Sequence, residues 1–253
     1  MEKFSDKIGL YDIWTVIFPG VVCLIGVRSI YNFMVSLSES LSITPGIAGK
    51  VGLILRINIT IPRDIYELFA LFAFSYICGL VLQELSSILK HNIIYKTGDP
   101  RALLLDKTAG ILNEHELDRL LPVFKRLNNG KDFLNLSSEE LKEESTYLFH
   151  RINKHLQDQK KSNEYVKLNV IYNVCYTLCV VLMLFGFIIS SFAINYFFCE
   201  QYPSALYSLM LLCIIGVLFW ILFSKGKRFY RYWVRNIVFT YEELCGNNCT
   251  NSN

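Results

Sequence analysis

The chain has 253 residues, of which 53% are hydrophobic and 19% are charged, and its mean hydropathy is +0.34. Such a chain is too apolar for an ordinary soluble protein and too charged to lie entirely within a membrane. We therefore expect membrane spans combined with a soluble segment. The net charge of +3 is small, so the distribution of basic residues along the chain is more informative than their sum.

Four segments predict membrane-spanning helices. The two weaker ones come first, at residues 9–27 and at residues 62–90, where the second has a short apolar core. The strongest segment, residues 168–198, contains no charged residue and no histidine and is longer than the roughly 20 apolar residues that cross a bilayer. After a short loop, residues 205–223 form another uncharged run. These last two segments predict an antiparallel membrane hairpin.

The first predicted span contains Pro19 and Gly20 near its middle. Proline removes one hydrogen bond of a helix and glycine loosens the next turn, so a kink is expected there. The kink is compatible with a moving helix. It is also compatible with a neighbouring span that packs closely against Gly20, as small residues allow in membranes.

The sequence thus predicts an all-α fold, namely a four-helix transmembrane protein with a helical cytoplasmic insert between spans two and three and both termini cytoplasmic. The predicted parts are the N-terminus with span one (1–36), an external loop (37–61), span two (62–90), the helical insert (91–166), the hairpin of spans three and four (167–224), and a basic aromatic cytoplasmic tail (225–253).

The orientation follows from the basic residues. In this arrangement 21 of the 25 Lys and Arg fall on one side of the membrane, and the positive-inside rule places that side in the cytoplasm. Lys3 and Lys7 before an apolar run resemble the start of a signal peptide, but Arg28 stands where a small-residue cleavage site is expected. We therefore expect the first span to be a retained anchor.

The insert is the soluble segment that is large enough to carry a function of its own. Asn113 is expected to cap a helix over 114–127, and Ser137 with Glu140 predicts a capping box at the start of a second helix. A helix pair of this size has little core of its own, so it should pack on itself, on the basic tail or on copies from other subunits. Helix is favoured again from Glu164, either continuous with span three or broken at 162–163.

We find no catalytic signature. His115-Glu116 lacks the second histidine of a zinc-protease helix, and the string from His150 to His155, which contains Arg151, is one residue short of the Arg-to-His spacing of HEPN ribonucleases. The cysteine pairs at 175/179 and 245/249 lack suitable histidine or carboxylate partners. We therefore expect a protein that is not an enzyme and that has no cofactor and no metal.

Span three has one narrow polar sector if it is helical. The sector is polar at both ends and apolar in the middle, and its pore-lining candidates are Asn173, Thr177, Val180, Leu184 and Ser191. An apolar constriction between polar vestibules can close a pore by dewetting, with Val180 and Leu184 as the gate. The alternative is that these polar side chains only form hydrogen bonds within the helical bundle.

The tail interleaves cations with aromatic rings directly after span four. Its candidate ligand-binding residues are Lys227, Arg228, Arg231, Arg235 and Trp233. Aromatic and basic residues at this position commonly anchor a helix to anionic lipid headgroups. The same residue types can also bind an anionic ligand such as a nucleotide or an oligonucleotide through charge and stacking.

The opening KIGLYDIWTVIFPGVV, the second-span motif FSYICGLVLQELSSIL and the order of the predicted segments resemble small bacterial four-span proteins of anti-phage defence operons. The proteins that this layout resembles include Hailong-type and Kiwa-type membrane subunits and CRISPR-associated membrane accessories. The resemblance covers most of the chain in layout and supplies no catalytic residue. It implies a multi-pass protein of the bacterial inner membrane that acts as an effector or a sensor.

Two functional hypotheses follow from this resemblance. The first is an oligomeric channel or membrane-permeabilising effector of an abortive-infection system, gated at residues 91–166 by a cytoplasmic cue such as a nucleotide signal or a soluble partner protein from the same operon. One chain with four spans encloses little pore, so the first hypothesis requires a homo-oligomer. The second is a non-conducting membrane anchor or sensor that recruits a soluble partner. A small transporter is disfavoured, because the spans lack paired intramembrane charges.

Overall fold

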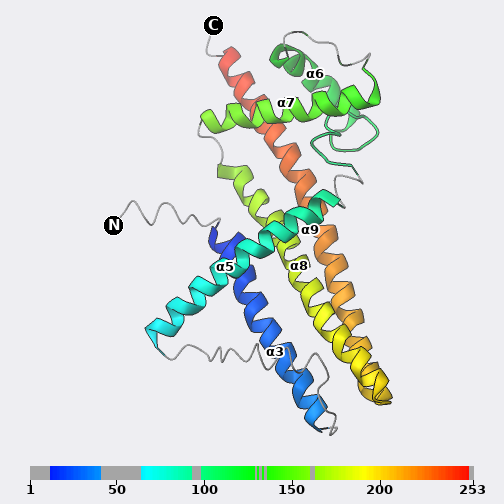
Figure 1. Ribbon diagram of the computed structural model, residues 1–253. Coiled ribbons are helices and arrows are strands. Elements are labelled where there is room, and N and C mark those ends of the chain that lie inside the picture. Colours follow the sequence, from blue (N-terminus) through cyan, green and yellow to red (C-terminus); the bar gives the residue numbers. More distant parts are fainter. Residues whose placement is uncertain are drawn as a thin grey trace. The chain divides into compact units, whose positions relative to one another are not determined.

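The computed structural model describes residues 12–40, 64–92, 98–128, 130, 133, 136–159 and 163–250. Within these ranges the chain is helical and contains no strand (Figure 1). The elements in order are η1 (Ile13–Ile17), α3 (Phe18–Ser40), α5 (Ile65–Lys90), α6 (Glu114–Leu127), α7 (Ser138–Asp158), α8 (Asn163–Phe198) and α9 (Tyr202–Thr250). The expected external loop (37–61) lies outside the described residues from residue 41 onward, as do the first two residues of the expected second span.

Four helical segments are long and apolar enough to cross a membrane. They cover Ile13–Leu37, Ile65–Lys90, Lys167–Phe198 and Tyr202–Cys245. The predicted all-α class with four spans is therefore confirmed. Helix α9 is much longer than the predicted fourth span because the basic segment that follows the span is helical as well.

The chain divides into two compact units. The first, which we call the span unit, comprises residues 1–89 and 173–225, and the second, the insert unit, comprises residues 90–172 and 226–253. Helices α8 and α9 each contribute residues to both units. Helix α8 is unbroken from Asn163, whereas residues 160–162 before it lie outside the described part of the chain.

In the span unit, the first helix and α5 meet backbone to backbone. A Cβ atom placed on Gly20 would lie 1.9 Å from the carbonyl oxygen of Ser75, and one placed on Gly79 would lie 2.0 Å from the carbonyl oxygen of Val16. No side chain fits between the two helices at these points. The expectation that a neighbouring span packs against Gly20 is thus confirmed.

The proline of the first span follows a widened turn. Residues Ile13–Ile17 form a π-helix in which the N–H of Phe18 donates to the carbonyl of Ile13, and Pro19 comes next. A proline cannot donate to the carbonyl four residues earlier, and π turns are a common way for a helix to accommodate such a break in its ladder. The irregularity therefore lies in the turn before Pro19 rather than at Gly20.

Two clusters of buried side chains hold the span unit together. One contains Cys23, Leu82, Val180, Val181 and Phe185, from α3, α5 and α8. The other contains Met34, Ile189, Phe192, Tyr196 and Ala205, from α3, α8 and the start of α9. A hydrogen bond of 2.9 Å from the Tyr196 hydroxyl to the carbonyl of Met34 satisfies the buried phenol.

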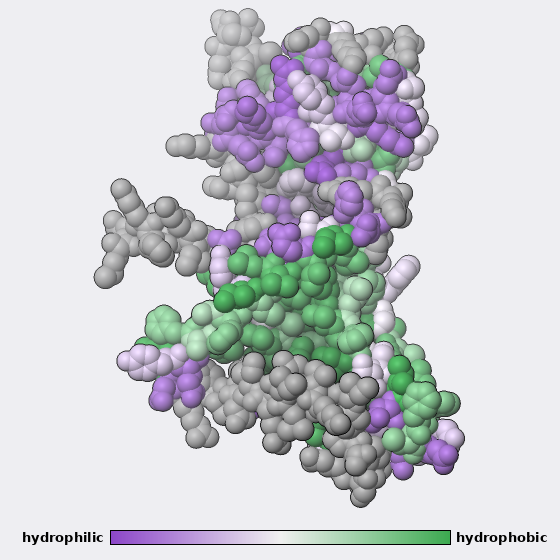
Figure 2. Space-filling view, viewed as in Figure 1, coloured by the Kyte–Doolittle hydropathy of each residue, from purple (hydrophilic) through white to green (hydrophobic). Residues whose placement is uncertain are grey.

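On the face drawn in Figure 2, exposed apolar side chains gather over part of the span unit. Large exposed residues of α5 include Tyr66 and Phe69, and those of α9 include Met210 and Trp220. Contiguous exposed apolar surface of this kind is typical of helices that face lipid or other membrane helices.

The insert unit contains the two predicted helices with the predicted caps. The Asn113 side chain accepts from the N–H of Glu116 at 2.8 Å and the Glu116 carboxylate accepts from the N–H of Asn113 at 2.9 Å. The same reciprocal pair joins Ser137 and Glu140 at the start of α7. The expected Asn113 cap and the predicted Ser137–Glu140 capping box are both confirmed, and the Glu116 carboxylate makes the first cap a capping box as well. Each depends only on residues three positions apart.

The core of the insert unit includes the C-terminal half of α9. Phe149 and Ile152 of α7 are buried, as are Val234, Ile237 and Val238 of α9, and the rings of Phe149 and Trp233 lie 5.3 Å apart. Of the three expected arrangements, packing on the basic segment is observed, and the insert helices also contact each other, because Asn128 Nδ2 at the end of α6 donates to the Glu144 carboxylate of α7 at 2.8 Å. That segment is the central helix of the insert unit rather than a separate tail.

Candidate functional site

Two sets of residues were expected to carry function, and we first describe the sector of span three. Of its five candidates, Asn173, Thr177 and Val180 are buried, Ser191 is half-buried and Leu184 is 37% exposed. The residues share one side of α8 by their spacing, but the burial of that side changes along the helix. The structure therefore does not present them as one open face.

The hydroxyl groups of this sector bond within α8. Thr177 Oγ1 donates to the carbonyl of Asn173 at 2.9 Å, and Ser191 Oγ donates to the carbonyl of Phe187 at 2.9 Å. This back-bonding satisfies a hydroxyl in an apolar environment without any partner helix. It accounts for the presence of both residues in a membrane helix by a purely local interaction.

The two apolar candidates of the expected gate differ in their surroundings. Val180 lies in the buried cluster that contains Cys23 of α3 and Leu82 of α5, whereas Leu184, one turn later, is partly exposed. In a single chain, α3 and α5 thus cover the first of these residues and leave the second accessible to lipid or to another subunit.

The basic and aromatic candidates of α9 also separate into two groups. Arg235 forms an ion pair with Glu116 of α6, and its guanidinium lies 5.3 Å from the ring centre of Phe239. Trp233 packs between aromatic rings, with Phe149 at 5.3 Å and Tyr230 stacked at 5.9 Å. Both candidates take part in the internal packing of the insert unit, so in this structure they do not present a free binding surface to a ligand.

The remaining candidates are open to solvent. Arg228 and Arg231 are exposed and Lys227 is half-buried, and the neighbouring Tyr232 is 49% exposed. Among the described residues, no carboxylate forms an ion pair with any of the three cations. These residues form the accessible basic face of α9.

A polar cluster that the sequence did not suggest holds the loop before α6 against α9. Asp99 accepts hydrogen bonds from the Arg101 guanidinium, the shortest at 2.7 Å, and from the Tyr230 hydroxyl at 2.8 Å. The order Gly98-Asp99-Pro100 is typical of a turn, and the Leu103 N–H donates to the Asp99 carbonyl at 3.0 Å. The long-range partner on α9 carries no local signal.

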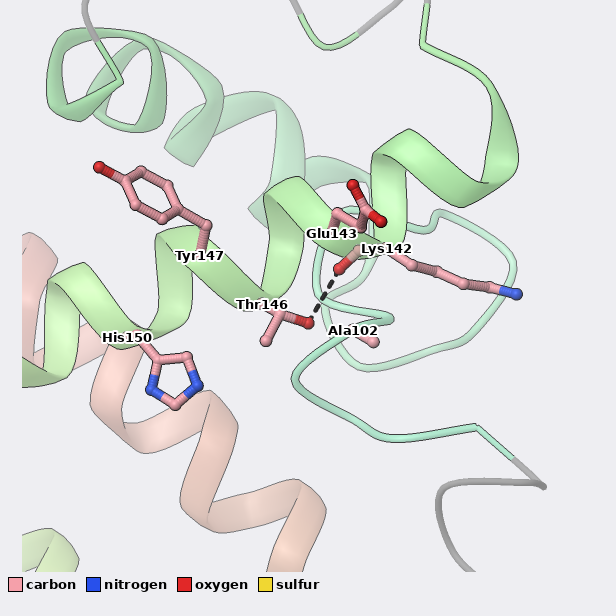
Figure 3. A pocket seen from close by; sticks show the side chains of 6 residues that line it. All are labelled: Ala102, Lys142, Glu143, Thr146, Tyr147 and His150. Atoms are coloured by element: carbon pink, nitrogen blue, oxygen red, sulfur yellow. Dashed lines mark hydrogen bonds between the residues drawn. The ribbon is translucent and has the colours of Figure 1, made fainter.

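The insert unit also has a surface cavity of about 430 Å³ along α7 (Figure 3). Its lining residues are Ala102, Lys142, Glu143, Thr146, Tyr147 and His150. The Thr146 hydroxyl is engaged with the backbone carbonyl of Lys142 at 2.9 Å. The side chains of Lys142 and Tyr147 point away from one another (Figure 3), so the cavity lacks the converging polar groups that typify a small-molecule site.

The positions of the potential metal ligands bear on metal binding. Within the described ranges, no three His, Cys, Asp or Glu side chains lie close enough together to hold a metal ion. Comparison of the chain with protein-family models, with curated proteins and with solved structures gives no match.

Proposed function

We propose that this protein is an integral inner-membrane effector of a bacterial anti-phage, abortive-infection system, and that it works as an oligomeric channel or permeabilising protein switched by a cytoplasmic cue at the insert unit. The observation that carries the proposal is the sharing of α9 between the two units. The helix spans the membrane with its first half and supplies the central core residues of the insert unit with its second half. A ligand that rearranges this core therefore acts on a helix that is also a span.

The contacts of α9 in the insert unit are suited to such a response. Arg235 pairs with Glu116 of α6, and Arg119 of α6 pairs with Glu242 at 2.8 Å. Ion pairs that are partly exposed contribute little net stability and are sensitive to nearby charges. An anionic signal or a charged partner that competes for these arginines would shift α6 relative to α9. Because α9 continues into span four, this local electrostatic change would be transmitted along the helix.

The exposed apolar surface of the span unit supports assembly. Large exposed side chains run along both α5, for example Phe69 and Phe74, and the membrane half of α9, for example Ile214 and Val217. Helices in lipid associate through packing of such faces. A pore formed between copies would be lined by residues that are accessible in the single chain, such as Leu184, and Val180 would contribute only after repacking.

The burial of most of the predicted sector favours a second candidate function. Because Asn173, Thr177 and Val180 are buried inside the span unit, the protein can be a non-conducting membrane anchor or sensor in which the insert unit recruits a soluble partner. In that case the spans hold the insert unit at the membrane surface, and their polar residues serve only the packing.

Substitution of Leu184 separates the two functions. We expect Leu184→Asn to raise ion leak and toxicity on induction in bacteria if Leu184 closes a pore, because a polar side chain favours wetting of the constriction. The matched control is Leu218→Asn on α9, which places the same polar group on an exposed position of another span. Equal leak from both variants, or from neither, would favour the anchor.

A further inference from the structure

The accessible basic face of α9 begins where the apolar run of the helix ends. Phe223 is the last residue of that run, and Arg228 and Arg231 follow it by five and eight residues. At the rise of an α-helix these positions lie about 7.5 Å and 12 Å beyond the run. The headgroup layer on each side of a bilayer is about 5–8 Å thick, so Arg228 is at its level and Arg231 is just past it.

The direction of helical side chains brings both arginines closer to that layer. Every Cα–Cβ bond in an α-helix tilts toward the helix N-terminus, and in α9 the N-terminal direction leads back to the apolar run. Long basic side chains also extend toward the interface when their stems lie against apolar surface. Both guanidinium groups can therefore reach the phosphate level.

Five of the seven arginines of the insert unit fall into two classes, and the exposed Arg126 of α6 and the half-buried Arg151 of α7 also have no ion pair among the described residues. Arg101, Arg119 and Arg235 each have a carboxylate partner, whereas Arg228 and Arg231 are exposed and have none among the described residues. The charges of the first class are balanced by carboxylates within the insert unit. The two arginines of the second class retain all their donors for an external anion, and guanidinium binds phosphate oxygens in a bidentate manner.

The aromatic residues nearby favour a lipid over a nucleotide as the source of that phosphate. Trp233 packs against Phe149 and Tyr230 and is half-buried, so part of the ring surface on which a base could stack is already covered. Tyr232 is exposed, and a tyrosine with an apolar ring and a polar hydroxyl is typical of the headgroup region.

We propose that Arg228 and Arg231, flanked by Tyr232, bind the phosphate of an anionic phospholipid such as phosphatidylglycerol. The site fixes the depth of α9 in the bilayer and makes the protein selective for anionic over zwitterionic lipid. This role is independent of ion conduction and holds for an effector and for an anchor.

The test is binding of fluorescent phosphatidylglycerol to the detergent-solubilised full chain, with fluorescent phosphatidylcholine measured in parallel. Each basic residue near a membrane surface contributes about a factor of five to the affinity for anionic lipid. The variant R228A/R231A should therefore bind phosphatidylglycerol about thirtyfold more weakly, with no change for phosphatidylcholine. The variant R228K/R231K keeps the charge and should retain most of the preference.

The matched control is R126A/K154A, which removes two exposed cations of α6 and α7 that have no ion pair among the described residues. It should bind phosphatidylglycerol as the unaltered protein does. A loss equal to that of R228A/R231A would show an effect of net charge only and would overturn the proposal. So would unchanged lipid binding by R228A/R231A. Displacement of the lipid by millimolar ATP or inorganic phosphate would show a site for soluble phosphates, and would also overturn it.

Discussion

Tyr230 and Asp99 lie 131 residues apart in the chain, and the hydroxyl of the first donates to a carboxylate oxygen of the second at 2.8 Å. The bond fastens the loop that precedes α6 to the helix that continues span four. An aromatic residue that composition alone would place at a lipid headgroup is thus a buried contact of the insert unit.

Removing the Tyr230 hydroxyl tests this contact. A hydrogen bond to a charged acceptor contributes about 1.5–3 kcal/mol, so Tyr230→Phe should lower the free energy of unfolding of the insert unit by about that amount. Hydrogen exchange of residues 98–105 should speed up correspondingly. Tyr232→Phe is the control because Tyr232 is exposed, and an equal effect of both substitutions would contradict the assignment.

Arg235 should behave differently from Arg231, although both lie on α9 within the same basic segment. Arg235→Gln breaks the ion pair with the partly buried Glu116 and should lower the free energy of unfolding of the insert unit by about 0.5–1 kcal/mol in thermal or denaturant unfolding, as expected for a partly exposed pair. Arg231→Gln should leave stability unchanged, because no carboxylate among the described residues pairs with it. Two equal effects would show that the division of the basic segment into internal and external cations is wrong.

The contact of the first helix with α5 should tolerate no added carbon. The variant Gly20→Ala places a methyl group against the backbone carbonyl of Ser75, and overpacking of this kind typically costs about 1–3 kcal/mol. We expect a lower melting temperature of the detergent-solubilised protein. Gly216→Ala is the control, since nothing lies within 4 Å of a Cβ there, and a drop of the same size in that variant would indicate a general sensitivity of the spans to alanine.

Two thiols report on the same helix pair. Cys23 of α3 belongs to the buried cluster of the span unit, and Cys78 of α5 packs against that cluster. Oxidation by copper phenanthroline in membranes should join them in an intrachain disulfide, as each thiol releases one proton to the medium and gives one electron to copper(II). Mass spectrometry of peptides should detect the link, and Cys78→Ser should abolish it. Labelling of the exposed Cys213 by a maleimide should persist, and absence of the 23–78 link in oxidised wild-type protein would contradict the α3–α5 packing.

The elements that could be predicted from the sequence depend on neighbouring residues. Long uncharged runs indicated the spans, and the spacing of Ser137 and Glu140 indicated a helix start that the structure contains. The partners of these elements could not be predicted in the same way. Nothing local distinguishes Arg235, which pairs with α6, from Arg231, which is exposed, because the difference depends on which side of α9 the insert helices cover.

The candidate sector of α8 illustrates the same limit. Periodicity correctly groups Thr177, Val180 and Leu184 on one side of a helix, but it contains no information on where α3 and α5 lie. The cluster around Cys23 and Leu82 covers Val180, and Leu184 is left partly exposed. Long-range packing therefore decides which residues of a polar sector remain available for function.

The most direct test of the proposed effector function is the membrane potential of bacteria that express this protein with its neighbouring genes, followed by a potential-sensitive dye during phage infection. If the protein is a cue-dependent effector, infected cells should depolarise and uninfected cells should not. The variant Leu184→Asn should depolarise cells even without infection. A potential that stays unchanged under infection in cells where the protein still restricts phage would contradict conduction, and would assign the function to recruitment by the insert unit.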